Sequence, residues 1–279
     1  MEHSVKIMGI VNLTDNSYYA ASRCLDENSD VMTDKALERI GKMLDEGADI
    51  IDIGACSTRP GSEAVGEAEE WRRLEPVLRA VREKFPECKV SVDTYWASVV
   101  AKTAELFGGD AVKYFIVNDI SAGEDDPEML PLVGRLGLRY IAMHKRGNPK
   151  TMQSFCDYDD VTAEVIRYFH EFADKANYHG IKDWILDPGF GFAKTVDQNY
   201  RLLAELHRFA EENFSETSPE ILVGVSRKSM IYRMFDITPE EALPATQVLH
   251  FKAMQSGASI LRVHDVAEAV RTRTLYSKM

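Results

Sequence analysis

Short apolar segments alternate with amphipathic segments along the whole chain, and this repetition constrains the fold more than any other feature. Eight segments rich in β-branched residues have the length and composition of strands that are buried on both faces. They are residues 6–13, 48–55, 89–94, 114–121, 139–145, 183–189, 221–226 and 259–265. Eight strand and helix units in roughly 250 residues predict an α/β fold, a (β/α)8 or TIM barrel, because a doubly wound sheet usually has five or six strands.

Glycines mark the ends of several helical segments between these strands. Gly47, the pair Gly108 and Gly109, and Gly257 each follow an amphipathic run, as is typical of helix C-termini, where left-handed dihedrals are common. Pro76 lies inside one helical pattern and predicts a kink or a break there. Because no linker or low-complexity segment divides the chain, we expect one domain over residues 1–279.

The charge of the chain excludes whole classes of partner. A formal net charge of -12 leaves no basic face for nucleic acid or for an anionic membrane. No apolar run is long enough to cross a bilayer, and the N-terminus lacks the features of a signal peptide. Neither C-x-x-C pairs nor zinc-like spacings occur among Cys24, Cys56, Cys88 and Cys156. We therefore predict a cytoplasmic protein with reduced thiols and small-molecule partners.

Polar residues occur at or just after the C-terminal end of nearly every predicted strand. They are Asn12, Thr58, Asp93, Asn118, Asp119, His144, Asp187, Lys228, Arg262 and His264. In a barrel these ends converge on the face that carries active sites. Single residues also have structural explanations, since Asn12, Asp93 or Asn118 could cap a helix and His144 could be a core histidine. Asp119 follows Asn118 directly and should point to the opposite face, so we predict a structural role for it.

The segment ILVGVSRKS, residues 221–229, ends an apolar strand in two adjacent cations. Arg227 and Lys228 leave the core just before Ser229, which can open a helix. Cations at such a position need compensation, so a bound anionic or strongly polar group is expected there. The structural alternative for Arg227 is an outward-facing ion pair, and we leave it out of the predicted site.

The segment DPGFGFAKT, residues 187–195, superficially suggests a nucleotide-binding P-loop. The spacing fails, because Pro188 stands at the first glycine of that motif and Ala193 stands where the motif needs a glycine before Lys194. A glycine-rich loop that lets the backbone approach a ligand explains the segment better, with Asp187 offering a carboxylate at the strand end.

These motifs together resemble the dihydropteroate synthase family nearly from end to end. The matching segments are MGIVNLT, GADIIDIGACSTRPGSE, SVDT, VNDIS, MH at 143–144, LDPGFGF, GVSRKS and RVHDV. STRPG and SRKS are the most specific of them. The resemblance implies that para-aminobenzoate attacks the methylene of 6-hydroxymethyl-7,8-dihydropterin pyrophosphate, which releases pyrophosphate and forms 7,8-dihydropteroate.

The resemblance also implies which residues bind the pterin. Asp187 would accept hydrogen bonds from the guanine-like edge of the pterin, with Asp93 and Asn118 completing this recognition. Lys228 would donate to the pterin carbonyl and ring nitrogen, and the planar guanidinium of Arg262 would stack on the ring. Met143 would pack against it. Catalysis is assigned to Lys228, Arg262 and Asp93.

For the leaving group and the second substrate, the resemblance implies a further set of residues. Asn12 would ligate Mg²⁺, the one expected cofactor, and Thr58, Arg262 and His264 would contact the phosphates. The helix that begins near Ser229 would present free N–H groups to the carboxylate of para-aminobenzoate. The other residues assigned to substrate binding are Arg59, Phe192 and Gly224. A homodimer is expected by family analogy.

The loop after the first strand departs from the family pattern. It reads NLTDNSYYAAS, so that Asp15 replaces a proline, and Asn16 and Ala20 replace two acidic residues. This loop is expected to close over the second substrate, and the loss of two carboxylates could weaken catalysis. A further hypothesis is that Asp15 supplies a carboxylate from a neighbouring position. Ala193, in place of a family glycine, is expected to adopt ordinary helical or extended dihedrals.

Two alternatives to the enzyme remain. The first is a pterin-binding paralogue whose pocket survives while its transfer step has decayed. The second is a methyltransferase whose barrel binds a reduced folate, a class that would share Asp93, Asn118 and Asp187. That class gives no reason for STRPG or SRKS, and the chain carries no extra corrinoid module, so it ranks last.

Overall fold

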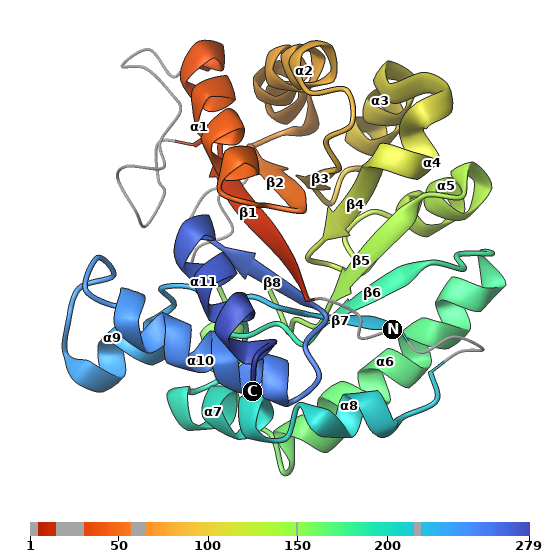
Figure 1. Ribbon diagram of the computed structural model, residues 1–279. Helices are drawn as coiled ribbons and strands as arrows, with labels where there is room; N and C mark the ends of the chain where they lie inside the picture. The colour runs from red at the N-terminus through yellow and green to blue at the C-terminus, as the bar shows by residue number, and fades with distance from the viewer. Residues whose placement is uncertain (1–4, 15–30, 57–64, 149, 215–218) are drawn as a thin grey trace.

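The computed structural model describes residues 5–14, 31–56, 65–148, 150–214 and 219–279, which form a closed parallel β-barrel surrounded by helices (Figure 1). The strands follow one another around the barrel in chain order, and the last strand pairs with the first. They are β1 (Lys6–Asn12), β2 (Ile50–Gly54), β3 (Val90–Asp93), β4 (Phe115–Asp119), β5 (Arg139–Met143), β6 (Trp184–Asp187), β7 (Glu220–Val223) and β8 (Ile260–Val263). The predicted (β/α)8 barrel is confirmed.

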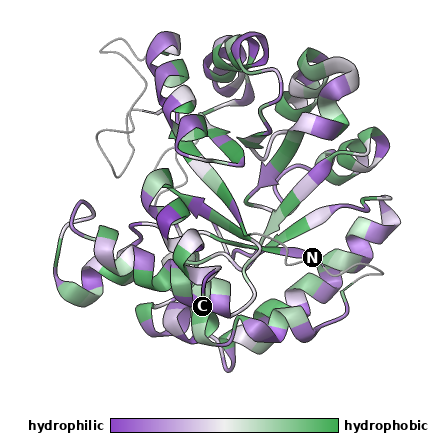
Figure 2. Cartoon of the chain, in the orientation of Figure 1, coloured by the Kyte–Doolittle hydropathy of each residue, from purple (hydrophilic) through white to green (hydrophobic). Residues whose placement is uncertain are grey.

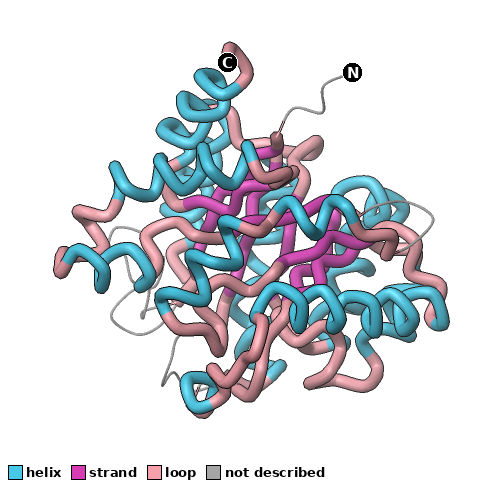
Figure 3. The backbone as a smooth tube through the Cα atoms, turned by 90° about the horizontal axis from the view of Figure 1, so that it is seen from below, coloured by secondary structure: helices cyan, strands magenta, loops and turns pink. Residues whose placement is uncertain are grey.

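Helices occupy the connections between successive strands and enclose the strands when the molecule is viewed from below (Figure 3). The helices are α1 (Thr33–Asp45), α2 (Glu67–Lys84), α3 (Ala97–Phe107), α4 (Ala111–Tyr114), α5 (Met129–Leu136), α6 (Val161–Tyr178), α7 (Val196–Ala204), α8 (His207–Glu211), α9 (Ser229–Phe235), α10 (Leu243–Gln255) and α11 (Val266–Tyr276). Two short 3₁₀ turns, η2 (Gly108–Asp110) and η3 (Met152–Ser154), complete the described elements.

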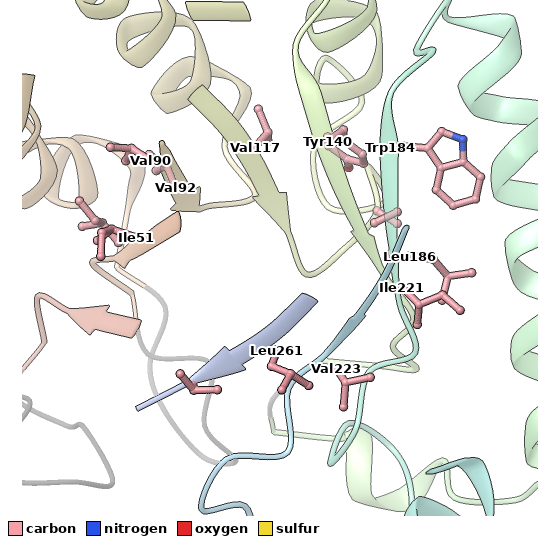
Figure 4. Close-up of a cluster of buried hydrophobic side chains, with 14 of the residues drawn as sticks. Ile51, Val90, Val92, Val117, Tyr140, Trp184, Leu186, Ile221, Val223 and Leu261 are labelled. Atoms are coloured by element: carbon pink, nitrogen blue, oxygen red, sulfur yellow. The ribbon is translucent and has the colours of Figure 1, made fainter. Parts of the chain in front are cut away.

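Two apolar layers result from the alternation of side chains along each strand. The outward-facing side chains pack under the helices, as Figure 4 shows for Val117, Tyr140 and Leu186. Figure 2 shows the matching pattern, with hydrophobic colour over much of the strands and mixed colour on the helices. The inward-facing side chains form a separate layer across the barrel interior: Met8, Ile50, Ile116, Ile141, Ile185, Leu222 and Ile260. This layer closes the barrel, so that it is a packed core and not a pore.

Charged residues close the N-terminal end of the barrel beneath this inner layer. Lys6 Nζ lies 2.7 Å from Glu220 Oε1, and Arg139 donates both to Glu220 and to Asp183. Burial opposes the charge of Glu220, but its hydrogen bonds to Lys6 and Arg139 hold its pKa below the ordinary value. Each of these charges therefore has a partner within the protein, and this end of the barrel is a stabilising closure.

The predicted strands all exist, although every one of them ends earlier than the sequence suggested. The first, predicted over residues 6–13, ends at Asn12, and the one predicted over residues 183–189 ends at Asp187. Polar side chains and glycines after these positions form loops instead. The expected break at Pro76 is wrong, because α2 runs continuously through it. Of the glycines predicted to follow helices, Gly47, Gly108 and Gly257 adopt positive φ, and Gly109 does not.

Within the described residues, no helix is both long enough and apolar enough to cross a membrane. Cys56, Cys88 and Cys156 are free thiols, and Cys24 lies outside the described part of the chain.

Candidate active site

A layer of polar side chains lies next to the inner apolar layer, at the C-terminal end of the barrel. Two residues beyond a layer position, the side chain again points inward, so Ile50 leads to Asp52, Ile116 to Asn118 and Ile185 to Asp187. The same step on other strands reaches Met143, Gly224 and Arg262. The barrel therefore brings residues predicted from separate strand ends onto one face.

A network of charges links β2, β3, β4 and β8 within this polar layer. Arg262 Nε donates to Asp52 Oδ2 at 2.6 Å, and its Nη2 donates to Asp93 Oδ2 at 3.0 Å. Asn118 Nδ2 donates to Asp52 Oδ1 at 3.2 Å. Asp52 is fully buried and sits at the centre of the network. The sequence analysis missed Asp52, although its position two residues beyond Ile50 in an otherwise apolar strand is a signal that could have revealed it.

The ionisation of this network is shifted by burial and by neighbouring charges. Burial raises the pKa of Asp93 to about 7, against the attraction of Arg262 and with the repulsion of Asp52. Burial also opposes the charge of Arg262, but Asp52 and Asp93 more than offset it and raise the pKa of the guanidinium. Arg262 is therefore a fixed cation, whereas Asp93 can gain a proton near neutral pH.

Asp187 ends β6 and is buried beside a glycine-rich loop. Its Oδ1 accepts a hydrogen bond from the N–H of Gly189 at 2.8 Å, and burial raises its pKa. Gly189 has φ +72°, and a Cβ there would lie 1.9 Å from the carbonyl oxygen of His144. Only glycine fits this position, so the loop turns sharply and leaves the Asp187 carboxylate at the strand end.

Lys228 reaches the same loop from the end of β7. Its ammonium group donates to the carbonyl oxygen of Phe190 and lies 5.1 Å from the centre of the Phe192 ring. Burial lowers its pKa to about 8, and the carboxylates of Asp187 and Asp93 partly oppose this shift. A Cβ on Gly224 would lie 4.0 Å from Lys228 Nζ and 3.9 Å from Arg262 Cβ, so the backbone of Gly224 lies close beside the ammonium group.

Lys194 holds the glycine-rich loop from beneath. Its buried ammonium group donates to the carbonyl oxygens of Gly189 and Phe192 at 3.0 and 3.1 Å and lies 3.0 Å from His144 Nδ1. Burial lowers its pKa to about 7 and also lowers that of His144. Both residues thus support the loop, in agreement with a core role for His144. The expectation of ordinary dihedrals at Ala193 is wrong, because φ is +48° there.

The end of β7 is tied to the end of β8 by two consecutive residues. Arg227 makes a two-pronged ion pair with Asp265, with distances of 2.7 and 2.9 Å, and also donates to the carbonyl oxygens of Pro239 and Glu240. Its side chain is 5% exposed, so the predicted ion pair exists but faces the interior. Ser226 Oγ lies 3.1 Å from His264 Nδ1.

The remaining predicted site residues lie as follows. Asn12 is half-buried at the end of β1, and Met143 is buried at the end of β5. The helix α9 begins at Ser229, as predicted. Thr58 and Arg59 lie outside the described residues, as do Asp15, Asn16 and Ala20. Asp119 points away from the polar layer and accepts hydrogen bonds from Ser121, Gly123 and Tyr140, in line with its predicted structural role.

The described residues at the mouth of the barrel would give the expected magnesium ion few protein ligands. In the part of the chain that the structure describes, no group of three histidine, cysteine or carboxylate side chains could hold a metal. Asn12 offers an amide oxygen at the mouth of the barrel. Mg²⁺ commonly takes one or two protein oxygens and completes its shell with water and substrate phosphates.

Comparisons with known proteins agree with this geometry. The sequence profile of the family described as pterin binding enzyme matches residues 8–264. The dihydropteroate synthase of Escherichia coli (strain K12) is 40% identical over 266 residues, which cover 95% of this chain and 88% of that protein.

Solved structures with the same architecture carry informative ligands. A Yersinia pestis dihydropteroate synthase in complex with a sulfonamide drug superposes with a TM-score of 0.88 at 34% identity, covering 100% of this chain and 95% of that one. A Xanthomonas albilineans dihydropteroate synthase with 4-aminobenzoic acid gives 0.84 at 34% identity, covering 98% and 92%. The chain therefore belongs to the pterin binding enzyme family, among the dihydropteroate synthases, the transferases that join a pterinylmethyl group to para-aminobenzoate in folate biosynthesis.

Proposed function

We propose that this chain condenses 6-hydroxymethyl-7,8-dihydropterin pyrophosphate with para-aminobenzoate through the polar layer at the C-terminal end of its barrel. The observation that carries the assignment of roles is the convergence of buried Asp187 with half-buried Asp93 and Lys228, three ionisable groups whose pKa values are all shifted toward the neutral form. Burial has removed water from around these ionisable groups. A polar ligand that forms hydrogen bonds with them would stabilise their charged forms and so bind favourably.

The pterin ring is assigned to the space above the inner apolar layer. Asp187 and Asn118 lie at the ends of β6 and β4 and can accept and donate hydrogen bonds along the polar edge of the ring. Lys228 can leave the carbonyl of Phe190 and donate to the pterin carbonyl. Met143 provides an apolar surface at the end of β5.

Arg262 is the candidate for stacking on the pterin ring. Asp52 and Asp93 hold two edges of the guanidinium, so its plane is fixed before any ligand arrives. A fixed plane loses little side-chain entropy when a ring stacks on it. Asp93 is then both a recognition group and the partner that orients Arg262.

Para-aminobenzoate is assigned to the mouth of the site beside Phe192 and Ser229. Phe192 packs near Lys228 and offers an aromatic wall, while Ser229 opens α9 and has backbone N–H groups available for a carboxylate. Arg59 and Thr58 lie outside the described residues, and the family motif alone assigns Arg59 to substrate binding and Thr58 to the phosphates. Sulfonamides that mimic para-aminobenzoate are expected to compete there.

The pyrophosphate group is assigned to the β1 and β8 side of the mouth. Asn12 would hold Mg²⁺, which neutralises phosphate charge when bound. His264 and Arg262 stand at the end of β8 and supply donors to the phosphate oxygens. As the C–O bond breaks, charge grows on the pyrophosphate and on the pterin methylene, so fixed donors on this side assist the reaction electrostatically.

The reaction needs positioned groups and no covalent nucleophile. The C–O bond breaks with its electron pair leaving on pyrophosphate, the amine nitrogen of para-aminobenzoate forms a C–N bond to the methylene, and the amine releases one proton to solvent. Its attack requires an approach opposite the leaving group, which the two assigned subsites on either side of Lys228 would provide.

The assembly and location of the chain complete the proposal. We assign it to a homodimer in the cytoplasm by family analogy. Met234 and Phe235 on α9 and Val248 on α10 are exposed on the outer helices, where a second copy could cover them. Sedimentation analysis of the purified chain tests this assignment, and a monomer at micromolar concentration would contradict it.

Pyrophosphate release by the purified chain tests the function. Release should require Mg²⁺, the pterin pyrophosphate and para-aminobenzoate together, and should fall at least 100-fold in Lys228→Ala, since a charge-assisted hydrogen bond in the transition state is lost. Lys6→Ala, at the opposite end of the barrel, is the matched control and should keep its rate. Pterin binding without release in the wild-type chain would instead indicate a binding paralogue.

A further inference from the structure

The hydroxyl group of Ser226 makes two contacts with a single residue, His264. The backbone N–H of His264 donates to Ser226 Oγ at 3.2 Å, and His264 Nδ1 lies 3.1 Å from the same oxygen. Ser226 is 4% exposed. In the described part of the chain these are the only partners of Ser226 Oγ, so the hydroxyl proton has a single acceptor within reach.

Counting protons fixes the direction of the side-chain hydrogen bond. The backbone N–H of His264 can only donate, so it uses one lone pair of Ser226 Oγ. If His264 Nδ1 also donated, the buried hydroxyl proton of Ser226 would have no acceptor, and an unsatisfied buried group is costly. The favourable arrangement is therefore Ser226 Oγ–H donating to an unprotonated His264 Nδ1.

A neutral His264 ring must then carry its proton on Nε2. Burial and the neighbouring guanidinium of Arg262 lower the pKa of His264 to about 3, so the ring is neutral across the physiological range. Among the described residues, no protein atom forms a hydrogen bond with His264 Nε2. This atom is also absent from the set of buried atoms that lack a partner, so it is accessible to solvent. It therefore remains open to a ligand at the mouth of the barrel.

The neighbouring residues hold this pair in register. Arg227 and Asp265, which directly follow Ser226 and His264 in the chain, form the buried two-pronged ion pair between the same two loops. The N–H of Arg227 also donates to Thr246 Oγ1 on α10 at 3.1 Å. Hydrogen bonds from Arg227 to Thr246, Pro239 and Asp265 fix its position. The preceding residue, Ser226, is therefore held next to His264.

We propose that Ser226 is a positioning residue that selects the His264 tautomer with the proton on Nε2, so that the ring presents an N–H donor to the pyrophosphate group. The inference rests on the proposed function, which assigns His264 to the phosphates. A neutral donor suits a site where Arg262 already supplies a positive charge, since a second cation would be repelled by the first. The serine thus decides whether His264 offers the phosphates a donor or a lone pair.

Nitrogen NMR on the full chain tests the tautomer directly. Long-range ¹H–¹⁵N spectra should show the wild-type His264 ring as neutral and protonated at Nε2, with the signals assigned by their loss in His264→Gln. In Ser226→Ala a population protonated at Nδ1 should appear, and Ser226→Thr, which keeps the hydroxyl, should restore the wild-type pattern. A wild-type ring protonated at Nδ1, or the same tautomer population in Ser226→Ala, would overturn the inference.

Binding of inorganic pyrophosphate with Mg²⁺ tests the consequence. The amide N–H of glutamine approximates Nε2 and that of asparagine approximates Nδ1, so His264→Gln should bind more tightly than His264→Asn. Ser226→Ala should weaken binding by about three- to tenfold, as expected for one misdirected hydrogen bond. Equal binding by the Gln and Asn variants would reject a donor at Nε2.

These experiments separate the inference from the proposed function. The tautomer is measured without substrates, so it decides the role of Ser226 even if the wild-type chain releases no pyrophosphate. The KM for the pterin pyrophosphate should rise in Ser226→Ala while the KM for para-aminobenzoate stays unchanged. A merely structural role for Ser226 would shift both constants and the melting temperature together, and would contradict the inference.

Discussion

Both ends of the barrel carry charged side chains that are at least partly shielded from water, yet the pKa values of these side chains are shifted in opposite ways. At the N-terminal end Glu220 lies between Lys6 and Arg139, and its pKa is held below the ordinary value. At the C-terminal end the pKa of Asp93 is raised to about 7 and that of Lys228 is lowered to about 8. The N-terminal end stabilises the charge of Glu220, whereas at the C-terminal end burial opposes the charges of Asp93 and Lys228 beside the fixed cation Arg262.

This difference separates a structural ion-pair cluster from a binding site. Charges that have found their partners within the protein add to the stability of the fold. Charges shifted toward neutrality are poorly compensated, and they become favourable only when a ligand or ordered water completes them. Both ends carry charged residues, so the direction of the pKa shift, and not the presence of charge, distinguishes them.

Replacing Asp52 should produce the largest effect, on activity at the C-terminal end. Asp52→Asn removes the carboxylate that accepts hydrogen bonds from Arg262 Nε and from Asn118 Nδ2. The guanidinium then loses its fixed plane while keeping Asp93, so we expect kcat/KM for the pterin substrate to fall about 10- to 100-fold, as for the loss of a charged hydrogen bond. Steady-state kinetics with both substrates measures this, and a lower melting temperature with unchanged kcat/KM would make Asp52 a purely structural residue.

Replacing Glu220 should show the opposite response at the N-terminal end. Glu220→Gln keeps the shape of the side chain but removes the charge shared by Lys6 and Arg139. Because the pair is only partly shielded from water, we expect the free energy of unfolding to fall by about 1–2 kcal/mol with kcat unchanged. Urea denaturation and the pyrophosphate assay measure the two quantities. A large loss of kcat at full stability would mean that the two ends are coupled.

The pH dependence of activity should report the C-terminal end alone. Above pH about 8 Lys228 loses its proton, so kcat/KM should fall tenfold per pH unit. Lys228→Arg keeps a cation that does not titrate in this range, so its residual activity should not show this alkaline decrease in kcat/KM. A decrease that persists near pH 8 in Lys228→Arg would assign it to another group.

The pH dependence of stability should differ between Lys228, Asp93 and Glu220. The unfolded chain keeps Lys228 protonated up to about pH 10.5, so between pH 8 and 10.5 it binds more protons and the contribution of Lys228 to stability rises with pH. Asp93 binds its proton more tightly when folded, so its contribution falls as pH rises from 3.8 to about 7. Glu220, with a lowered pKa, instead loses its stabilising contribution as pH falls below its ordinary value of 4.5.

The strands and the face that carries the site follow from periodicity, whereas the partners of each side chain do not. All eight strands were predicted because β-branched runs and glycine-terminated helices are local signals. Asp52 was missed because its importance depends on Arg262, which is distant in sequence and reaches it only when the barrel closes. Arg227 was expected to face outward. No local sequence signal shows that its buried guanidinium donates to Asp265 and to two backbone carbonyl groups, because these partners are brought to it only by the fold.

The smallest expected effect is on stability, at Ala193 in the glycine-rich loop that follows Asp187. This buried residue has φ +48°, a left-handed conformation that costs a residue with a Cβ roughly 1 kcal/mol relative to glycine. Ala193→Gly should therefore raise the free energy of unfolding by up to about 1 kcal/mol, less whatever glycine adds to the entropy of the unfolded chain. Denaturant melting measures it, with Ala210→Gly in the exposed part of α8 as a control that should be destabilising. If Ala193→Gly lowers stability instead, the methyl group packs well enough to outweigh the strain, and the loop beside Lys194 is held by its apolar contacts and not only by its hydrogen bonds.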